Sequence, residues 1–278
     1  FSRAGGALGL TQPTVSFQIS SLEEDLGTRL FDRGVKGVTI TKSGEILYQY
    51  ARRILRLVGE AKQAIDQLTG LIKGELTIGA STIPGEYILP ELMCQFKDRY
   101  PGIQINLIIG DTKGIINKVM DNEVEVGVVG AKEKGDKLEF TEFVSDKLVL
   151  IAPAHCRWFE HDTITVDQLK GVPFVLRESG SGTRASMRQR LSEVGMSEDE
   201  FNIVMRLGST AAVRKAVECG AGVSIVSERV VQSEMKLGLI KQINIEGLDL
   251  SRDFYIVHRR RRTLSPAAGA LLEFLGGG

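Results

Sequence analysis

The stretch LGLTQPTVSFQISSLEEDLGTRLF, residues 8–31, contains a short turn and then an amphipathic helix with clear start and stop signals. Thr11 is a good N-cap, and Pro13 falls in the first helical turn, where its missing N–H costs no helical hydrogen bond. Gly27 is a typical helix terminator. Apolar residues recur between these signals at spacings of four, three and four and form one inner stripe: Val15, Ile19, Leu22 and Leu26. The sequence therefore predicts a helix that begins near residue 12 and ends before Gly27.

The outward face of this helix begins with amides and hydroxyls. In a helix-turn-helix unit the second helix enters the major groove by its N-terminal residues, and amides and hydroxyls are groups that hydrogen-bond base edges. An ordinary amphipathic helix in a small helical domain is the alternative, since a motif match is only a hypothesis. The expected DNA contacts on this helix are Gln12, Pro13, Thr14, Ser16, Phe17 and Gln18.

The next segment favours the DNA-reading interpretation. Residues 29–41, RLFDRGVKGVTIT, form a short basic hairpin with glycines near its tip. This pattern is typical of a wing beside a recognition helix. Arg33 and Lys36 are its natural phosphate contacts, and the expected partner is double-stranded DNA.

The pattern TQPTVSxQIxxLExxLGxxLFxR, followed by ITxxG, resembles the LysR-type transcriptional regulators over residues 11–44. The chain departs from that pattern in two places. Phe17 stands where the family commonly has a basic residue, and residues 12–25 contain no Lys or Arg. Residue 1 falls within the first of the two motif helices, with Gly5 and Gly6 where the family prefers helix formers, so we expect that first helix to be truncated.

Composition indicates a soluble globular protein of two or three domains, with 278 residues, 42% hydrophobic and 25% charged. The net charge is zero, yet residues 1–73 carry 10 basic and 7 acidic residues, against 25 and 28 in residues 74–278. No apolar run approaches the ~18 residues of a membrane span, so we expect no membrane partner. The cysteines, at positions 94, 156 and 219, are far apart and odd in number, which predicts buried free thiols in a cytoplasmic protein.

A long helix is expected after Gly44, because the following stretch lacks proline and its apolar residues alternate spacings of four and three. A seam held over about three heptads favours pairing with another helix, and the resemblance adds the linker-helix dimer of the family. The alternative is that this face packs on the winged domain of the same subunit. The assembly is expected to be a homodimer or a homotetramer, paired through Leu47, Ala51, Ile54, Val58, Ala61, Ile65 and Leu68.

From residue 75 onward, short β-branched runs alternate with helical patterns, which predicts mostly parallel sheets with ligand sites at the carboxyl ends of the strands. The resemblance implies two lobes similar to type 2 periplasmic binding proteins. The expected fold is α+β and multidomain. Its expected parts are a winged helix-turn-helix (1–41), a linker and dimerisation helix (42–73), effector lobe I (74–150 plus 253–278) and effector lobe II (151–252).

Small hydroxyl residues occur at four strand-to-helix junctions, and each lobe has two of these junctions. A helix N-terminus presents free N–H groups to an anion, although each residue alone is equally explained as a plain N-cap. The loop SGSGTR, residues 179–184, adds flexible backbone donors and the Arg184 guanidinium. The family binds its effectors between the lobes, at positions that match Ser81, Thr82, Thr112, Thr183 and Ser209. With their neighbours, the expected effector residues are Ser81, Thr82, Thr112, Ser181, Thr183, Ser209 and Thr210.

Other chemistries find little support. The loop at residues 179–184 lacks the GxxxxGK[ST] pattern of a P-loop, the three histidines have no metal-ligand spacing, and no catalytic set stands out. We expect no enzyme, cofactor or metal. The leading hypothesis is a sequence-specific DNA-binding regulator controlled by a small anionic effector, an oxyanion or a carboxylate. A small-anion solute-binding protein without DNA binding and an enzyme on the same scaffold are the alternatives.

Overall fold

The computed structural model describes residues 1–34, 37–68, 72–133 and 135–276. These residues form two compact units, Phe1–Lys62 and Gln63–Gly278. Within the described ranges, no helix is both long and apolar enough to cross a membrane.

The first unit has a helix pair, a hairpin and most of a long helix. The Thr11 side chain accepts a hydrogen bond from the Thr14 N–H at 3.4 Å, and Gly27 takes a left-handed φ of 64°, so the predicted start and end of the second helix are confirmed. On its inner face Val15 is buried, whereas Leu26 is 47% exposed. The elements of this unit are α1 (Ser2–Leu8), α2 (Gln12–Leu26), β1 (Phe31–Gly34), β2 (Gly37–Ile40) and the larger part of α3 (Lys42–Leu68).

The hairpin of β1 and β2 is antiparallel, with Phe31 opposite Ile40, and it confirms the predicted wing. The Glu23 carboxylate of α2 accepts hydrogen bonds from the backbone N–H groups of Leu30 and Phe31, at 2.7 and 3.1 Å. These bonds attach the start of the wing to the predicted recognition helix. The long helix predicted after the wing is also confirmed, since α3 runs without a break from Lys42 to Leu68.

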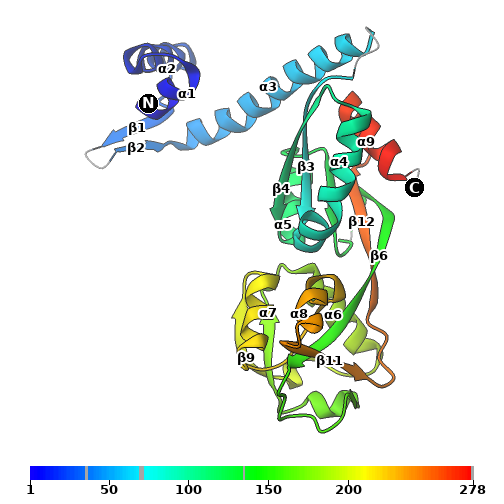
Figure 1. Ribbon diagram of the computed structural model, residues 1–278. Coiled ribbons are helices and arrows are strands. Elements are labelled where there is room, and N and C mark those ends of the chain that lie inside the picture. Colours follow the sequence, from blue (N-terminus) through cyan, green and yellow to red (C-terminus); the bar gives the residue numbers. More distant parts are fainter. Residues whose placement is uncertain (35–36, 69–71, 134, 277–278) are drawn as a thin grey trace. The chain divides into compact units, whose positions relative to one another are not determined.

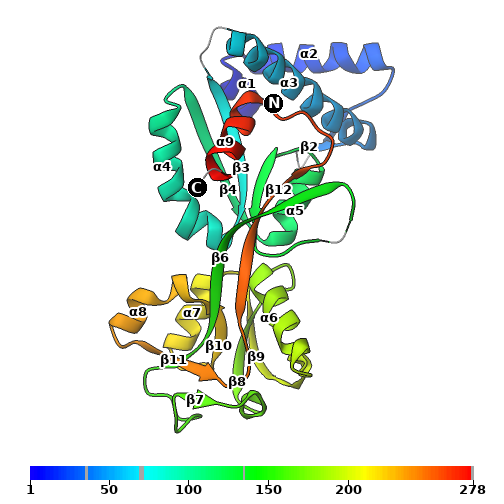
Figure 2. The ribbon, with the colours of Figure 1, turned by 90° about the vertical axis from the view of Figure 1, so that its right-hand side faces the viewer.

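The second unit has two lobes that share two long strands, β6 (Leu138–Pro153) and β12 (Ser251–Arg259), as Figures 1 and 2 show. In lobe I, β3 pairs in parallel with β4 and β5, whereas β12 is antiparallel to β5 and β6. The sheet is therefore mixed, because β12 returns from the other lobe. The remaining elements of lobe I are β3 (Gly74–Ser81), the π-helical turn η1 (Pro84–Ile88), α4 (Leu89–Arg99), β4 (Ile103–Gly110), α5 (Thr112–Met120), β5 (Val126–Val129) and α9 (Pro266–Gly276).

Lobe II is built around the far ends of the shared strands. β10 and β11 pair antiparallel with β6, and β8 pairs in parallel with β9. Its elements are β7 (Thr163–Ile164), η2 (Val166–Leu169), β8 (Pro173–Arg177), α6 (Gly182–Glu193), η3 (Glu198–Glu200), β9 (Asn202–Leu207), α7 (Thr210–Glu218), β10 (Ser224–Ser227), η4 (Glu228–Val230), α8 (Gln232–Lys236) and β11 (Ile240–Ile245).

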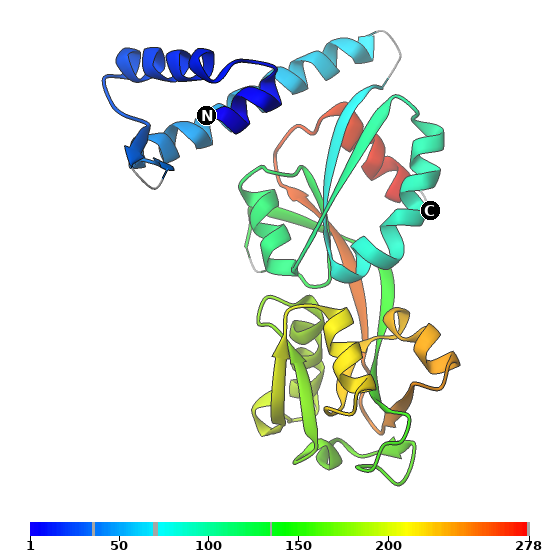
Figure 3. The same ribbon diagram turned by 60° about the vertical axis from the view of Figure 1, so that its left-hand side comes forward.

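Helices cover both faces of the lobe I sheet, with α4 and α9 on one face and α5 on the other (Figure 3). One buried apolar cluster includes Ile78 of β3, Phe254 of β12 and Val213 of α7. The core is therefore continuous between the lobes. The expectation of three buried cysteines is wrong: Cys94 and Cys219 are exposed, because one lies on the outer side of α4 and the other caps the end of α7.

Candidate functional site

A pocket lies between the two lobes of the second unit, where β3, α5, β8, α6 and β12 meet. Lobe I contributes hydroxyls and one carboxylate, lobe II contributes hydroxyls and the guanidinium of Arg177, and the shared strand β12 contributes the guanidinium of Arg252. The volume open to the centre of a water molecule is about 10 Å³, roughly room for one water. The lining residues are Ser81, Thr82, Ile83, Asp111, Thr112, Gly130, Arg177, Ser181, Gly182, Thr183, Arg252 and Phe254.

The structure brings five of the seven expected effector residues to this pocket: Ser81, Thr82, Thr112, Ser181 and Thr183. The other two, Ser209 and Thr210, lie behind it at the start of α7. Ser209 is the N-cap of α7 and accepts a hydrogen bond from Ala212 N–H at 3.1 Å. The buried Thr210 hydroxyl accepts a hydrogen bond from Nη1 of Arg177. Thr210 therefore positions a lining residue.

The expected pattern of hydroxyl caps holds only in lobe II. Ser181 caps α6 by accepting a hydrogen bond from the Arg184 N–H at 3.4 Å. In lobe I the cap of α5 is Asp111, whose Oδ1 lies 2.5 Å from the Gly114 N, and η1 has no side-chain cap. Thr112 is the first residue of α5, and its hydroxyl accepts a 3.4 Å hydrogen bond from the Gly130 N–H. An aspartate is an equally good N-cap, but its charge repels an anion.

Two buried arginines on the pocket wall were not predicted from the sequence. Arg177, at the end of β8, is 4% exposed, and Arg252, on β12, is 6% exposed. The guanidinium that was expected in this region, that of Arg184, instead binds Glu198 at 2.7 Å within lobe II. A charged residue within an apolar β-strand, as in SRDFYIV, is the signal that could have identified Arg252, because a buried charge needs a partner.

Arg252 is held by a buried ion pair where the shared strands cross between the lobes. Its Nε donates to Oδ2 of Asp146 at 2.9 Å, and its Nη1 donates to the Thr183 hydroxyl at 3.2 Å. Ser227 donates a further hydrogen bond to Asp146, at 2.8 Å. Burial lowers the pKa of Arg252 from its ordinary value, and the attraction of Asp146 opposes that shift. The contact with Thr183 joins this pair to the pocket.

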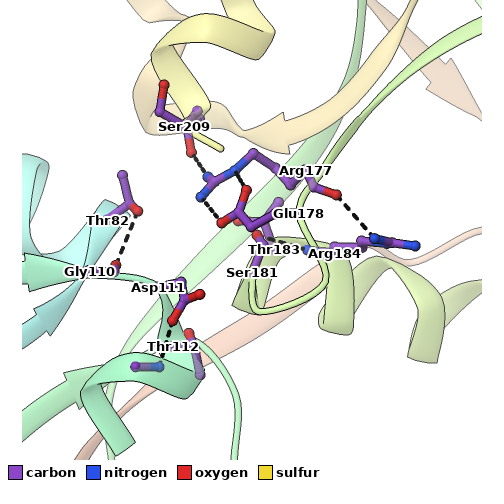
Figure 4. Close-up of polar contacts among 12 residues, drawn as sticks. Thr82, Gly110, Asp111, Thr112, Arg177, Glu178, Ser181, Thr183, Arg184 and Ser209 are labelled. Carbon is purple, nitrogen blue, oxygen red and sulfur yellow. Dashed lines mark hydrogen bonds and ion pairs between the residues drawn. The ribbon is translucent and has the colours of Figure 1, made fainter. Parts of the chain in front are cut away.

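Arg177 has a carboxylate partner from the next residue, as Figure 4 shows. Its Nε and Nη2 donate to the two carboxylate oxygens of Glu178, at 2.8 and 2.7 Å. Partial burial raises the pKa of Glu178, but the hydrogen bonds and charge of Arg177 outweigh it and leave that pKa below its ordinary value. Each guanidinium on the pocket wall is therefore already paired with a carboxylate.

The lobes approach each other closely at two glycines of the loop before α6. A Cβ atom on Gly180 would lie 2.1 Å from Oδ2 of Asp111, and one on Gly182 would lie 2.4 Å from the Thr112 hydroxyl. The backbone N–H of Lys113 also donates to the Gly180 carbonyl, at 3.5 Å. A larger residue at either position would force Asp111 or Thr112 to move, so glycine suits this close approach of the lobes.

The expected DNA contacts of the first unit lie along α2. Phe17 is 75% exposed, Ser16 is half-buried, and the others on this helix are exposed: Gln12, Pro13, Thr14 and Gln18. Gln12 Nε2 donates to the Ser16 hydroxyl at 3.2 Å. Of the expected wing contacts, Arg33 lies in β1, and Lys36 falls outside the described residues.

The expected dimerisation seam lies on α3. Leu47 and Ala51 are half-buried, whereas Ile54 is 59% exposed and Val58 is 50% exposed. Ala61 is exposed as well. The remaining seam positions, 65 and 68, also lie in the helix. Because the middle of the seam faces solvent in one chain, packing on the winged domain of the same subunit does not account for it.

No group of three or more His, Cys, Asp and Glu side chains that could hold a metal ion occurs among residues 1–34, 37–68, 72–133 and 135–276. The hydroxyls and guanidiniums of the pocket are donors suited to a ligand with anionic oxygens.

Comparison with known proteins agrees with both units. Residues 1–45 match the family described as "Bacterial regulatory helix-turn-helix protein, lysR family", and residues 69–277 match the "LysR substrate binding domain". A curated relative, the "RuBisCO operon transcriptional regulator" of Allochromatium vinosum, is 33% identical over 99% of this chain and 90% of its own length.

Two solved structures share the fold. Full-length CbnR in complex with its target DNA is 21% identical, with a TM-score of 0.75 over 99% of this chain and 93% of that one. The regulatory domain of Synechocystis PCC6803 CcmR in complex with 2-PG is 24% identical, with a TM-score of 0.67 over 74% of this chain and 97% of that one. The chain belongs to the LysR family of helix-turn-helix transcriptional regulators.

Proposed function

We propose that this regulator responds to a small anion, an oxyanion or a carboxylate, that binds between lobes I and II. The observation that carries the proposal is the presence of two buried guanidiniums, Arg177 and Arg252, on the wall of a pocket otherwise rich in hydroxyls. The N-terminus of α6 adds backbone N–H groups and the positive end of a helix dipole. The 2-PG complex of the similar CcmR domain supports a small ligand in this type of domain.

The expected roles of the individual effector residues follow from their positions. Arg177 and Thr183 would hold the anionic oxygens from lobe II, and Ser81 and Thr112 would donate from lobe I. Thr82 would donate as well once its hydroxyl turns from the Gly110 carbonyl, to which it donates at 3.4 Å. A ligand larger than one water needs the lobes to separate and then to close again on it. Such closure shifts the conformational equilibrium only by the difference in affinity of the ligand for the two states.

We propose that the output is DNA binding through α2 and the wing, by a homodimer or homotetramer assembled through the seam on α3. The four-part division at residues 41/42, 73/74, 150/151 and 252/253 is the domain organisation that we propose. We further propose that the protein acts in the cytoplasm and without catalysis of its own. The solute-binding alternative gains no support, because residues 1–45 match a DNA-binding family.

The proposal is tested by titration calorimetry of the purified full chain with 2-PG, inorganic phosphate and, as a neutral probe, glycerol, combined with gel shifts on operator DNA. We expect heat from the anions only, and an anion-dependent change in the gel shift. Anion binding that is unaffected by Arg177→Lys, or the absence of any anion binding, would contradict an effector site in this pocket.

A further inference from the structure

We propose that Glu178 is a built-in counterion of Arg177, and that the anionic effector must displace it to bind. This inference rests on the proposed anion site, and it concerns how that site sets its own affinity.

The first step is the geometry of the pair. Arg177 presents one edge of its guanidinium, Nε and Nη2, to the two oxygens of Glu178 at 2.8 and 2.7 Å. Its Nη1 donates to Thr210 behind the pocket. A two-point fork is the arrangement that guanidinium groups prefer for carboxylates and phosphates. The edge of Arg177 that suits an anionic ligand is therefore the edge that Glu178 occupies.

The second step is mobility, which differs between the two carboxylates paired with pocket arginines. The Asp146 side chain is 1% exposed, is hydrogen-bonded by Ser227, and lies directly opposite Arg252 on paired strands. The Glu178 side chain is 29% exposed and lies in the loop after β8. Glu178 can rotate its side chain into water while backbone bonds of the loop, such as Ser181 N–H to the Glu178 carbonyl, stay in place.

The third step is the charge balance. With both pairs formed, the pocket presents two neutral ion pairs and the Asp111 carboxylate to an incoming ligand. A ligand with a single negative charge that replaces the Glu178 carboxylate gains little binding free energy, because one pair of hydrogen bonds to Arg177 is exchanged for another. A ligand with two negative charges, or with further oxygens for the hydroxyls of lobe I, gains more than it replaces. Because the same contact is displaced whichever anion binds, Glu178 lowers every affinity by the same factor, and only ligands that make these further contacts bind tightly.

The test is calorimetric titration of the full chain with two probes, sulfate as the dianion and acetate as the monoanion, in wild type and Glu178→Gln. The variant keeps the size and polarity of the side chain but removes its charge. We expect it to bind sulfate about tenfold more tightly, the value of one charge-assisted hydrogen bond. Its affinity for acetate should rise by about the same factor, because the same contact no longer has to be displaced. Glu178→Ala should change affinity in the same direction, which guards against an effect of the amide itself.

The matched control is Glu193→Gln. Glu193 is also paired with an arginine of lobe II, Arg190 at 3.1 Å, but on the exposed side of α6, so its loss should change the affinity for sulfate less than twofold.

Three outcomes would contradict the inference in distinguishable ways. Unchanged or weaker sulfate binding in Glu178→Gln, with binding still much weaker in Arg177→Lys, would overturn the role of Glu178 and leave the anion site standing. Sulfate binding that is unaffected by Arg177→Lys, or that is absent from both wild type and Glu178→Gln, would overturn the anion site together with the inference. Equal tightening in the Glu193→Gln control would also overturn it, because the effect would then arise from net charge alone.

Discussion

Two buried arginines of the pocket wall are each paired with a carboxylate. Arg252 pairs with Asp146 where β6 and β12 cross between the lobes, and Arg177 pairs with Glu178 at the end of β8, which we call the rim of the pocket. The two pairs differ in what holds them. Arg252 and Asp146 lie opposite each other on β12 and β6, so the sheet itself fixes their distance. Arg177 and Glu178 are neighbours in sequence, and only the arginine is fixed by the fold. The comparison indicates that the Arg252–Asp146 pair stabilises the contact between two strands, whereas the Arg177–Glu178 pair is a contact that can be exchanged.

The largest effect is expected from loss of the ion pair between β6 and β12. Asp146→Ala leaves Arg252 buried without its carboxylate, and removal of one partner of a buried pair costs about 3–5 kcal/mol. We expect a matching loss in the free energy of unfolding of the second unit, measured by urea denaturation. Glu178→Ala, the equivalent change at the rim, should cost far less. Similar losses in the free energy of unfolding of Asp146→Ala and Glu178→Ala would contradict the distinction between the two pairs.

The next prediction concerns the arginine at the rim. Arg177→Lys keeps the positive charge but removes the two-point fork, so we expect anion affinity to fall about a hundredfold, the worth of roughly two charge-assisted hydrogen bonds. Calorimetric titration with inorganic phosphate measures the affinity. Operator binding without effector should be unchanged in gel shifts. A variant that still binds phosphate like wild type would place the anion site elsewhere.

A smaller effect is expected at Thr183, which connects Arg252 to the pocket. Thr183 lines the pocket and accepts a hydrogen bond from Arg252. Thr183→Val keeps its shape but removes its hydroxyl, so we expect about a tenfold weaker response to effector, with operator binding intact. Thr163→Val, at an exposed site on β7, is the control. Loss of specific DNA binding in a folded Thr183→Val variant would count against the assignment of Thr183 to the effector pocket.

The smallest effect is a pH dependence at the rim. The folded-state pKa of Glu178 lies below its ordinary value of 4.5, so the pair contributes stability above that value and loses it as the pH falls through the folded pKa. We expect the difference in stability between wild type and Glu178→Gln, followed by thermal unfolding, to shrink on acidification below about pH 4.5. Solvent screening keeps the difference small because Glu178 is partly exposed. A difference that grows on acidification would reverse the sign of this linkage.

The sequence by itself determined the first unit and the general plan of the second. Thr11, Gly27 and the glycine-rich hairpin act on neighbouring residues, and capping and turn signals of that kind can be read within a few positions. The same local logic located the hydroxyls at the starts of helices in the lobes. It chose the wrong cap for α5, because Asp111 and Thr112 are both good candidates and only the folded loop selects between them.

The tertiary structure alone decided the charges of the pocket. Asp146 and Arg252 are 106 positions apart and meet through the register of β6 and β12, which no local pattern specifies. The same is true of Arg177 and Thr210, which come together only when β8 packs beside α7. A buried charge is stable only with its partner in place, and that partner is chosen by long-range packing, so the positive wall of the pocket could not be read from the chain.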